Sequence, residues 1–107
     1  MVEYVRVAPI SAARPDGPHA ESVFDELLVQ RLRQGCDTSF EILVHRHRPL
    51  VERVVAAVLK EPKNREEAVQ DVFMSVYRKI DLFRGDSTFT TWIYRVARNA
   101  ALLRRRR

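Results

Sequence analysis

FRGDSTFTTWIYRVARNAALLRRRR, residues 83–107, is the most informative stretch of the chain. A polar loop with one glycine, Phe83 to Thr91, leads into a predicted helix that begins near Trp92 and ends in four arginines. Residues 84–107 carry a net charge of +6, whereas the other 83 residues carry −1. The basic excess is confined to this stretch and interleaved with aromatic residues, which indicates a nucleic-acid surface.

The whole chain has 107 residues, of which 46% are apolar, and this suits one compact domain. Its single cysteine, Cys36, excludes an intrachain disulfide and favours a reducing, cytoplasmic location. No apolar run approaches the roughly 18 to 20 residues of a membrane span, so membrane insertion is not expected. Met1 to Ile10 contains charged residues and a proline and lacks the pattern of a signal peptide.

The N-terminal part up to residue 21 is rich in proline and glycine and is predicted to be a flexible leader. A short strand over Val2 to Val7 is the weaker interpretation, because no second strand pattern could pair with it. A first helix is predicted to open at Ser22, whose side chain would cap the amide of Asp25, and to stop at Gly35.

Three further helices are predicted downstream. The second starts at Asp37 or Thr38, and Pro49 within it predicts either a kink or two helices end to end. The third begins at Asn64, with Glu67 in a capping-box arrangement, and Ser87 or Thr88 caps the last. The predicted fold is all-α: a compact bundle of about four helices over residues 22–107.

Catalysis finds little support in the residue pattern. His45 and His47 are two apart and would point in different directions on a helix, so they cannot share a metal. We interpret both as solvated or partly packed helix residues. Cys36 has no neighbouring base and is better explained as a small residue at a helix junction. No glycine-rich phosphate loop is present. We therefore expect no enzyme activity, no metal and no cofactor.

The last helix carries groups suited to DNA. Arg95, Arg98 and Asn99 share one face, where arginine can bind phosphate or guanine and asparagine can pair with adenine. The alternative to DNA binding is that these cations are only solvated at the helix end, because cations favour a helix C-terminus. The terminal arginines would extend the contact along the phosphates and make binding depend on salt. The predicted duplex and backbone contacts are Arg95, Arg98, Asn99, Arg104, Arg105 and Arg106.

The loop before that helix is a candidate site for single-stranded bases. Stacking on aromatic rings contributes about 1–3 kcal/mol per base, and nearby polar groups can read base edges. Phe83 and Phe89 are equally compatible with anchoring the loop in the core, and Trp92 could belong to either. The candidate residues are Phe83, Arg84, Gly85, Asp86, Ser87, Phe89 and Trp92.

The third helix has an acidic outer face with exposed apolar side chains. DNA would be repelled by these carboxylates, whereas a protein partner with basic side chains would be attracted. An ordinary solvated helix face is the alternative. The predicted protein-contact face consists of Glu67, Gln70, Asp71, Met74 and Tyr77.

Three linked motifs resemble the second conserved region of bacterial sigma factors, and the short length and pattern resemble the extracytoplasmic-function (ECF) group. The motifs are EEAVQDVF at residues 66–73, IDLFRGD at 80–86 and FTTWIYRVARN at 89–99. The resemblance covers residues 26–107.

This resemblance implies a helical domain that docks on the β′ subunit of core RNA polymerase through the third-helix face. It further implies recognition and melting of the promoter −10 element, with a flipped non-template base bound in the Phe83 to Trp92 stretch. An anti-sigma factor is the expected inhibitory partner. The second domain of the family, which reads the −35 element, is expected to be absent from this chain.

Two other classes remain open from the residues alone. One is a helical regulator that binds double-stranded DNA without polymerase. The other is a protein-interaction bundle that binds no nucleic acid. The acidic third-helix face argues against the first, because a simple repressor would not need it.

Overall fold

A computed structural model of the chain describes residues 17–106, which form four α-helices and one short 3-10 helix. The predicted all-α fold is confirmed. Of the predicted leader over residues 1–21, residues 17–21 belong to α3 and residues 1–16 lie outside the described residues. The alternative strand at Val2 to Val7 and Arg107 also lie outside them. The elements are α3 (Gly17–Arg33), α4 (Asp37–Val58), α5 (Pro62–Lys79), the 3-10 helix η1 (Ile80–Leu82) and α6 (Phe89–Arg106).

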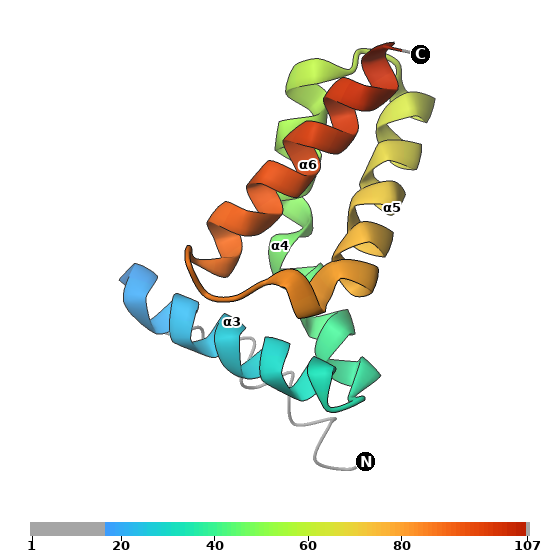
Figure 1. Cartoon of the computed structure of the whole chain (residues 1–107). Coiled ribbons are helices and arrows are strands. Elements are labelled where there is room, and N and C mark those ends of the chain that lie inside the picture. Colours follow the sequence, from blue (N-terminus) through green and yellow to red (C-terminus); the bar gives the residue numbers. More distant parts are fainter. Residues whose placement is uncertain (1–16, 107) are drawn as a thin grey trace.

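Three of the helices stand side by side and the fourth crosses one end of the group. Figure 1 shows α6 lying against both α4 and α5, while α3 passes beneath them close to the start of α6. The segment from η1 to α6 runs over α3 at this end. The candidate loop is therefore held between the crossing helix and the start of the basic helix.

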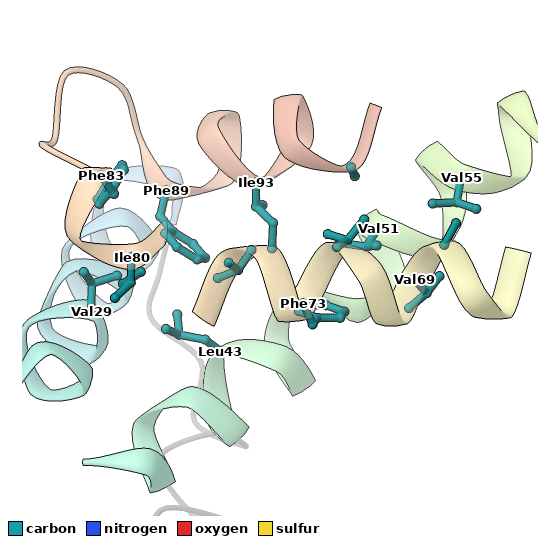
Figure 2. Packing of buried hydrophobic residues seen from close by; sticks show 14 of the residues in the cluster. Val29, Leu43, Val51, Val55, Val69, Phe73, Ile80, Phe83, Phe89 and Ile93 are labelled. Carbon is teal, nitrogen blue, oxygen red and sulfur yellow. The ribbon is translucent and has the colours of Figure 1, made fainter. Parts of the chain in front are cut away.

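A continuous apolar core fills the space between the helices. In Figure 2, Phe83 and Ile80 lie at the loop end of this core, and Val55 and Val69 lie at the other. Each fully buried apolar side chain contributes about 1.5–3 kcal/mol relative to an exposed one. The apolar side chains with less than 2% of their surface exposed and the largest volumes are Phe89, Leu43, Ile93, Val29, Val51, Val55, Val72 and Val76.

The turn between α3 and α4 confirms Gly35 as the predicted helix stop. Gly35 has a φ of 96°, in the left-handed region that favours glycine. Its N–H donates to the Leu32 carbonyl at 2.9 Å and the Cys36 N–H donates to the Arg31 carbonyl at 3.0 Å. This pair of bonds is a Schellman motif, which satisfies the last carbonyls of α3.

Two predicted helix starts were wrong. α3 begins at Gly17, so Ser22 lies inside the helix and not at its cap; Pro18 is compatible with this because proline is tolerated in a first turn. α5 begins at Pro62, after Glu61 as N-cap, so Asn64 is not the cap. The predicted capping box is replaced by a side-chain hydrogen bond from Asn64 to Glu61 at 3.2 Å.

α4 continues through Pro49 as one helix, so the alternative of two helices end to end was wrong. Pro49 is exposed, whereas His47 and Val51 beside it are buried. The backbone hydrogen bond that proline cannot donate is therefore missing on the solvent side, where water can replace it.

The start of α6 confirms one predicted cap and corrects one boundary. The Thr91 N–H donates to Oγ1 of Thr88 at 3.1 Å, so Thr88 is the N-cap. The helix then begins at Phe89, three residues before the predicted start at Trp92. This earlier start turns Phe89 into a helical residue that points into the core (Figure 2).

Candidate nucleic-acid interface

The aromatic residues of the candidate loop form a cluster under its surface. Phe83 is 4% exposed and Phe89 is fully buried, while Trp92 is partly buried. The ring centroids of Phe83 and Phe89 are 5.6 Å apart, and those of Phe83 and Trp92 are 5.4 Å apart. Buried rings in edge and tilted contact anchor the loop in the core and offer no free face to a base. Phe83 and Phe89 thus take the anchoring role in this structure, and Trp92 is the member that reaches the surface.

The polar part of the loop is exposed above this cluster. Arg84, Gly85 and Asp86 are exposed and Ser87 is partly so. Gly85 has a φ of 84°, a conformation in which a side chain would be strained. These residues present a guanidinium, a carboxylate, a hydroxyl and backbone groups at one place. Such groups can hydrogen-bond to the edges of an unstacked base.

A charged cluster that the sequence did not reveal lies beneath the loop. Asp25 of α3 is 1% exposed, and its Oδ1 accepts a hydrogen bond from Nε of Arg46 at 2.9 Å. Nε2 of His47 lies 3.1 Å from Oδ2 of Asp25, although without hydrogen-bond geometry. The His47 ring is also in edge contact with Phe89, 5.0 Å between centroids. A buried carboxylate needs such a partner, so this ion pair fixes α3 against α4.

The interpretation of His47 as a solvated or partly packed helix residue needs a correction, because it is 6% exposed and packs against Phe89. Asp25 was assigned to a helix first turn, and the structure gives it a buried partner on another helix. No pattern within one helix could have revealed this, since Asp25 and Arg46 are 21 residues apart. Among the described residues no group of three or more His, Cys, Asp or Glu could hold a metal ion. None of the described helices is long and apolar enough to cross a membrane.

Arg33 holds the first part of the loop. Its Nη2 donates to the Ile80 carbonyl at 3.0 Å and to the Phe83 carbonyl, and its Nε lies 3.9 Å from Asp81. Carbonyls at a helix end carry partial negative charge and lack partners within the helix. One guanidinium from α3 therefore fixes both η1 and the residue where the loop begins. No local pattern indicates this interaction, which spans 50 residues.

We expect Arg33→Ala to lower the free energy of unfolding by about 1.5–3 kcal/mol, as is typical of hydrogen bonds to a charged group. Arg33→Lys should recover only part of this, because an ammonium is a point charge and cannot reproduce the planar fork. Urea denaturation measures both. Arg31→Ala, which removes an exposed arginine from the same helix, is the matched control and should change the stability by less than about 0.5 kcal/mol. Equal losses of stability in Arg31→Ala and Arg33→Ala would contradict this role for Arg33.

The outer face of α6 shows the predicted basic groups together. Arg95, Arg98 and Asn99 are all exposed on this helix, while Ile93, Ala97 and Ala101 are buried on its inner side. Arg105 and Arg106 are exposed at its end. The face continues from the loop, because Thr88 caps the helix that carries it. Exposed guanidiniums along one face can bind the phosphates of a nucleic acid.

The predicted protein-contact face of α5 borders a groove against α4. Met74 is 56% exposed and Tyr77 is 46% exposed. The groove has a volume of about 750 Å³ and is lined by both apolar and charged side chains. Exposed methionine and tyrosine beside a groove are typical of protein interfaces. Its lining comes from α4 and α5 and includes Phe40, Val44, Arg48, Gln70, Phe73, Met74 and Tyr77.

Tyr77 is fixed in this groove by two contacts from the start of α4. Its hydroxyl donates a hydrogen bond to Oδ1 of Asp37 at 3.0 Å, and its ring meets the edge of Phe40 at 5.0 Å. The hydrogen bond raises the pKa of Tyr77 above its ordinary value. Tyr77 therefore has a fixed ring that is partly exposed at the surface.

Arg104 was predicted to contact phosphates, and the structure places it on the acidic face. Its Nη1 lies 2.8 Å from Oε1 of Glu67 and its Nη2 lies 2.7 Å from Oδ2 of Asp71. The hydrogen bond to Asp71 and the charges of both carboxylates raise the pKa of Arg104. The end of the basic helix is thus tied to the acidic helix. A DNA contact by Arg104 stays a prediction.

Comparisons with known proteins agree with this arrangement. Residues 43–107 match the family Sigma-70 region 2. The ECF RNA polymerase sigma-E factor of Escherichia coli strain K12 is 38% identical over 82 residues, covering 77% of this chain and 42% of that protein. The ECF RNA polymerase sigma-E factor of Haemophilus influenzae is 40% identical over 85 residues, covering 77% of this chain and 43% of that protein.

A solved structure is similar as well. It is the NMR structure of an engineered region 2 of sigmaE in complex with GTAAAA, 33% identical with a TM-score of 0.69. The match covers 74% of this chain and 82% of that one.

Fold and site together define a small helical domain with a basic helix and an exposed loop. Beside them lies an acidic helix face with exposed methionine and tyrosine side chains, as is typical of protein interfaces. The family match extends over more than half of the chain, and the chain belongs to the Sigma-70 region 2 family. The resemblance to ECF sigma factors is confirmed by the sigma-E relatives. The chain spans about two fifths of the length of these curated relatives.

Proposed function

We propose that this domain binds core RNA polymerase and recognises and melts the promoter −10 element. The observation that carries the proposal is the likeness to the engineered sigmaE region 2, which was solved in complex with GTAAAA. In this chain the corresponding fold exposes a polar loop directly before the Arg95, Arg98 and Asn99 face. The domain would act by binding and would carry out no covalent chemistry.

The loop is the candidate site for the single-stranded −10 region. Arg84, Gly85, Asp86 and Ser87 can reach the edge of a flipped base, and the partly buried Trp92 lies at their border. Phe83 and Phe89 support this surface from below through their contacts with Trp92. A rigid loop binds a base without first losing much conformational entropy, which favours affinity.

The face of Arg95, Arg98 and Asn99 is the candidate contact for the adjoining duplex and its backbone, together with Arg105 and Arg106. Phosphate contacts position a protein on DNA, and base contacts specify the sequence. An exposed asparagine beside two arginines supplies one group that could read a base in this otherwise phosphate-binding face.

The candidate polymerase contact is the α5 face of Glu67, Gln70, Asp71, Met74 and Tyr77, with the β′ subunit as partner. It combines carboxylates with exposed apolar area beside a groove. An anti-sigma factor would inhibit by covering this face or the loop. Because transcription takes place in the cytoplasm, a domain that binds core polymerase and an anti-sigma factor would be located there.

Two measurements test the proposal. The first is binding of the chain to fluorescent single-stranded GTAAAA and to a scrambled strand of the same composition; at least tenfold preference for GTAAAA is expected. The second is binding of the chain to core RNA polymerase in solution. Equal affinity for both strands would favour a nonspecific binder or a protein-interaction bundle. Tighter binding to the duplex form of this sequence than to the single strand, without any polymerase binding, would favour the duplex-binding regulator.

Salt dependence tests the binding of phosphates by α6. For duplex DNA the slope of log affinity against log salt changes by about 0.9 for each phosphate that the protein no longer neutralises. Arg95→Gln and Arg98→Gln should each make the slope shallower by that amount. Arg31→Gln, which removes an equal charge from α3, should leave the slope unchanged. A uniform change in all three variants would mean that only net charge matters.

A further inference from the structure

The acidic end of the α5 face is occupied by a residue of the same chain. Arg104 reaches from the last turn of α6 to Glu67 and Asp71, at 2.8 and 2.7 Å, with one terminal nitrogen on each carboxylate. Its remaining nitrogen, Nε, is buried without a hydrogen-bond partner in the described part of the chain. The side chain of Arg104 is 20% exposed, and those of Glu67 and Asp71 are 45% and 50% exposed.

The two carboxylates hold most of the negative charge that the α5 face offers to a basic partner. Arg104, Glu67 and Asp71 together carry a net charge of −1. The two carboxylates without Arg104 would carry −2. A basic side chain of a partner would meet carboxylates that each already accept a bond from Arg104 on one oxygen, Oε1 of Glu67 and Oδ2 of Asp71. It would have to replace the guanidinium or accept a weaker interaction.

Arg104 also lies where the two candidate surfaces adjoin. A groove of about 500 Å³ between α5 and α6 is lined by Met74 of the α5 face, Asn99 of the α6 face and Arg104 itself. Its neighbours Arg105 and Arg106 are exposed at the same helix end. Arg104 therefore belongs to the same helix end as these exposed cations, but its guanidinium lies on the carboxylates of α5.

We propose that Arg104 is an internal competitor for the acidic end of the α5 face, which core polymerase must displace in order to bind. Displacement returns the guanidinium to the basic end of α6, where it adds one cation for DNA. By linkage, a phosphate that draws Arg104 away uncovers Glu67 and Asp71 and strengthens polymerase binding by the same factor. The inference rests on the proposed function of the α5 face.

The test is the affinity of core polymerase for wild type and three variants of the whole chain, measured by fluorescence at low salt. Ion pairs at exposed positions contribute up to about 1 kcal/mol, so Arg104→Gln should bind about 2- to 5-fold more tightly than wild type. Arg104→Lys should lie between the two, because lysine keeps the charge but lacks the fork. Arg53→Gln, at an exposed arginine of α4, should match wild type. Raising the salt should diminish the gain of Arg104→Gln.

A purely structural role for Arg104 predicts no gain in affinity for polymerase when Arg104 is removed. Removing a fold-stabilising ion pair would lower the melting temperature and leave the affinity for polymerase unchanged or weaker, which would overturn the inference. An equal gain in Arg53→Gln would also overturn it, since net charge alone would then explain the result. If wild type binds polymerase and Arg104→Gln binds no better, only this inference fails. If wild type itself does not bind, the proposed polymerase contact fails together with it.

Discussion

Asp71→Arg is expected to weaken binding to core RNA polymerase at least 100-fold, equivalent to about 2.8 kcal/mol. The α5 face would then present an arginine where the proposed partner expects a carboxylate. Juxtaposed like charges at an interface cost several kcal/mol. Arg104 adds to the effect, because its 2.7 Å ion pair with Asp71 is removed and it remains as a second cation at the same place.

The fold should survive this substitution. Asp71 is half exposed and packs no apolar core, and exposed ion pairs contribute only about 0–1 kcal/mol. The melting temperature should fall by a few degrees at most. The measurement is binding of labelled core polymerase, with thermal melting of each variant followed in parallel.

Glu26→Arg is the matched control, since it reverses an exposed carboxylate of α3, outside the α5 face. It should bind polymerase within about twofold of wild type. Comparable losses of affinity in both variants would show that polymerase responds to net charge. Unchanged binding in Asp71→Arg would assign the polymerase contact to another surface and leave the α5 face as an ordinary solvated helix face.

Local sequence patterns accounted for the helices because their causes are local. Gly35 stops α3 through its left-handed backbone, and Thr88 caps α6 with its own hydroxyl. Apolar spacing placed Val69, Val72 and Val76 on the buried side of α5. The starts predicted at Ser22 and Asn64 failed because a proline in the first turn let the helix begin earlier, and α6 also begins before the predicted Trp92.

The sequence predicted which side chains of the candidate site are exposed. It did not predict the long-range interactions that hold them in place. Exposed arginines on α6 and the acidic α5 face follow from helix periodicity. The interactions beneath them join residues far apart in sequence: Arg33 to Ile80, Asp25 to Arg46, and Arg104 to Glu67. An arginine in a helical pattern gives no information about which distant carboxylate or carbonyl it will meet. Charge counting therefore separated a basic and an acidic surface that the structure joins through the two ion pairs of Arg104.

The sequence left open whether the aromatic residues of the loop stack on bases or anchor the loop in the core. A phenylalanine beside a glycine-containing loop suits both stacking and anchoring, and the choice depends on whether neighbouring helices cover it. Phe89 is covered by His47 of α4 and by Phe83 and Trp92. The covering residue His47 lies 42 positions away in the chain and belongs to the cluster around Asp25, which no local pattern revealed.

Phe89→Ala should destabilise the domain more than any other change in the loop. Removing a fully buried phenylalanine costs about 3–5 kcal/mol, because apolar burial is reduced and a cavity remains. Small domains have only about 5–15 kcal/mol of stability, so much of it would disappear. With about 4–8 °C for each kcal/mol, the melting temperature should fall by at least about 12 °C.

Phe89→Leu separates support of the loop from integrity of the fold. Leucine keeps much of the apolar volume, so the domain should remain folded, but it cannot reproduce the ring-to-ring packing on Phe83 and Trp92. A looser loop should bind GTAAAA several-fold more weakly in a folded protein. Thr90→Ala, at the exposed neighbouring position, is the control and should leave the melting temperature within about 2 °C. If Phe89→Leu instead bound as tightly as wild type, the aromatic cluster would hold the core without shaping the base site, and Arg33 would remain as the loop's support.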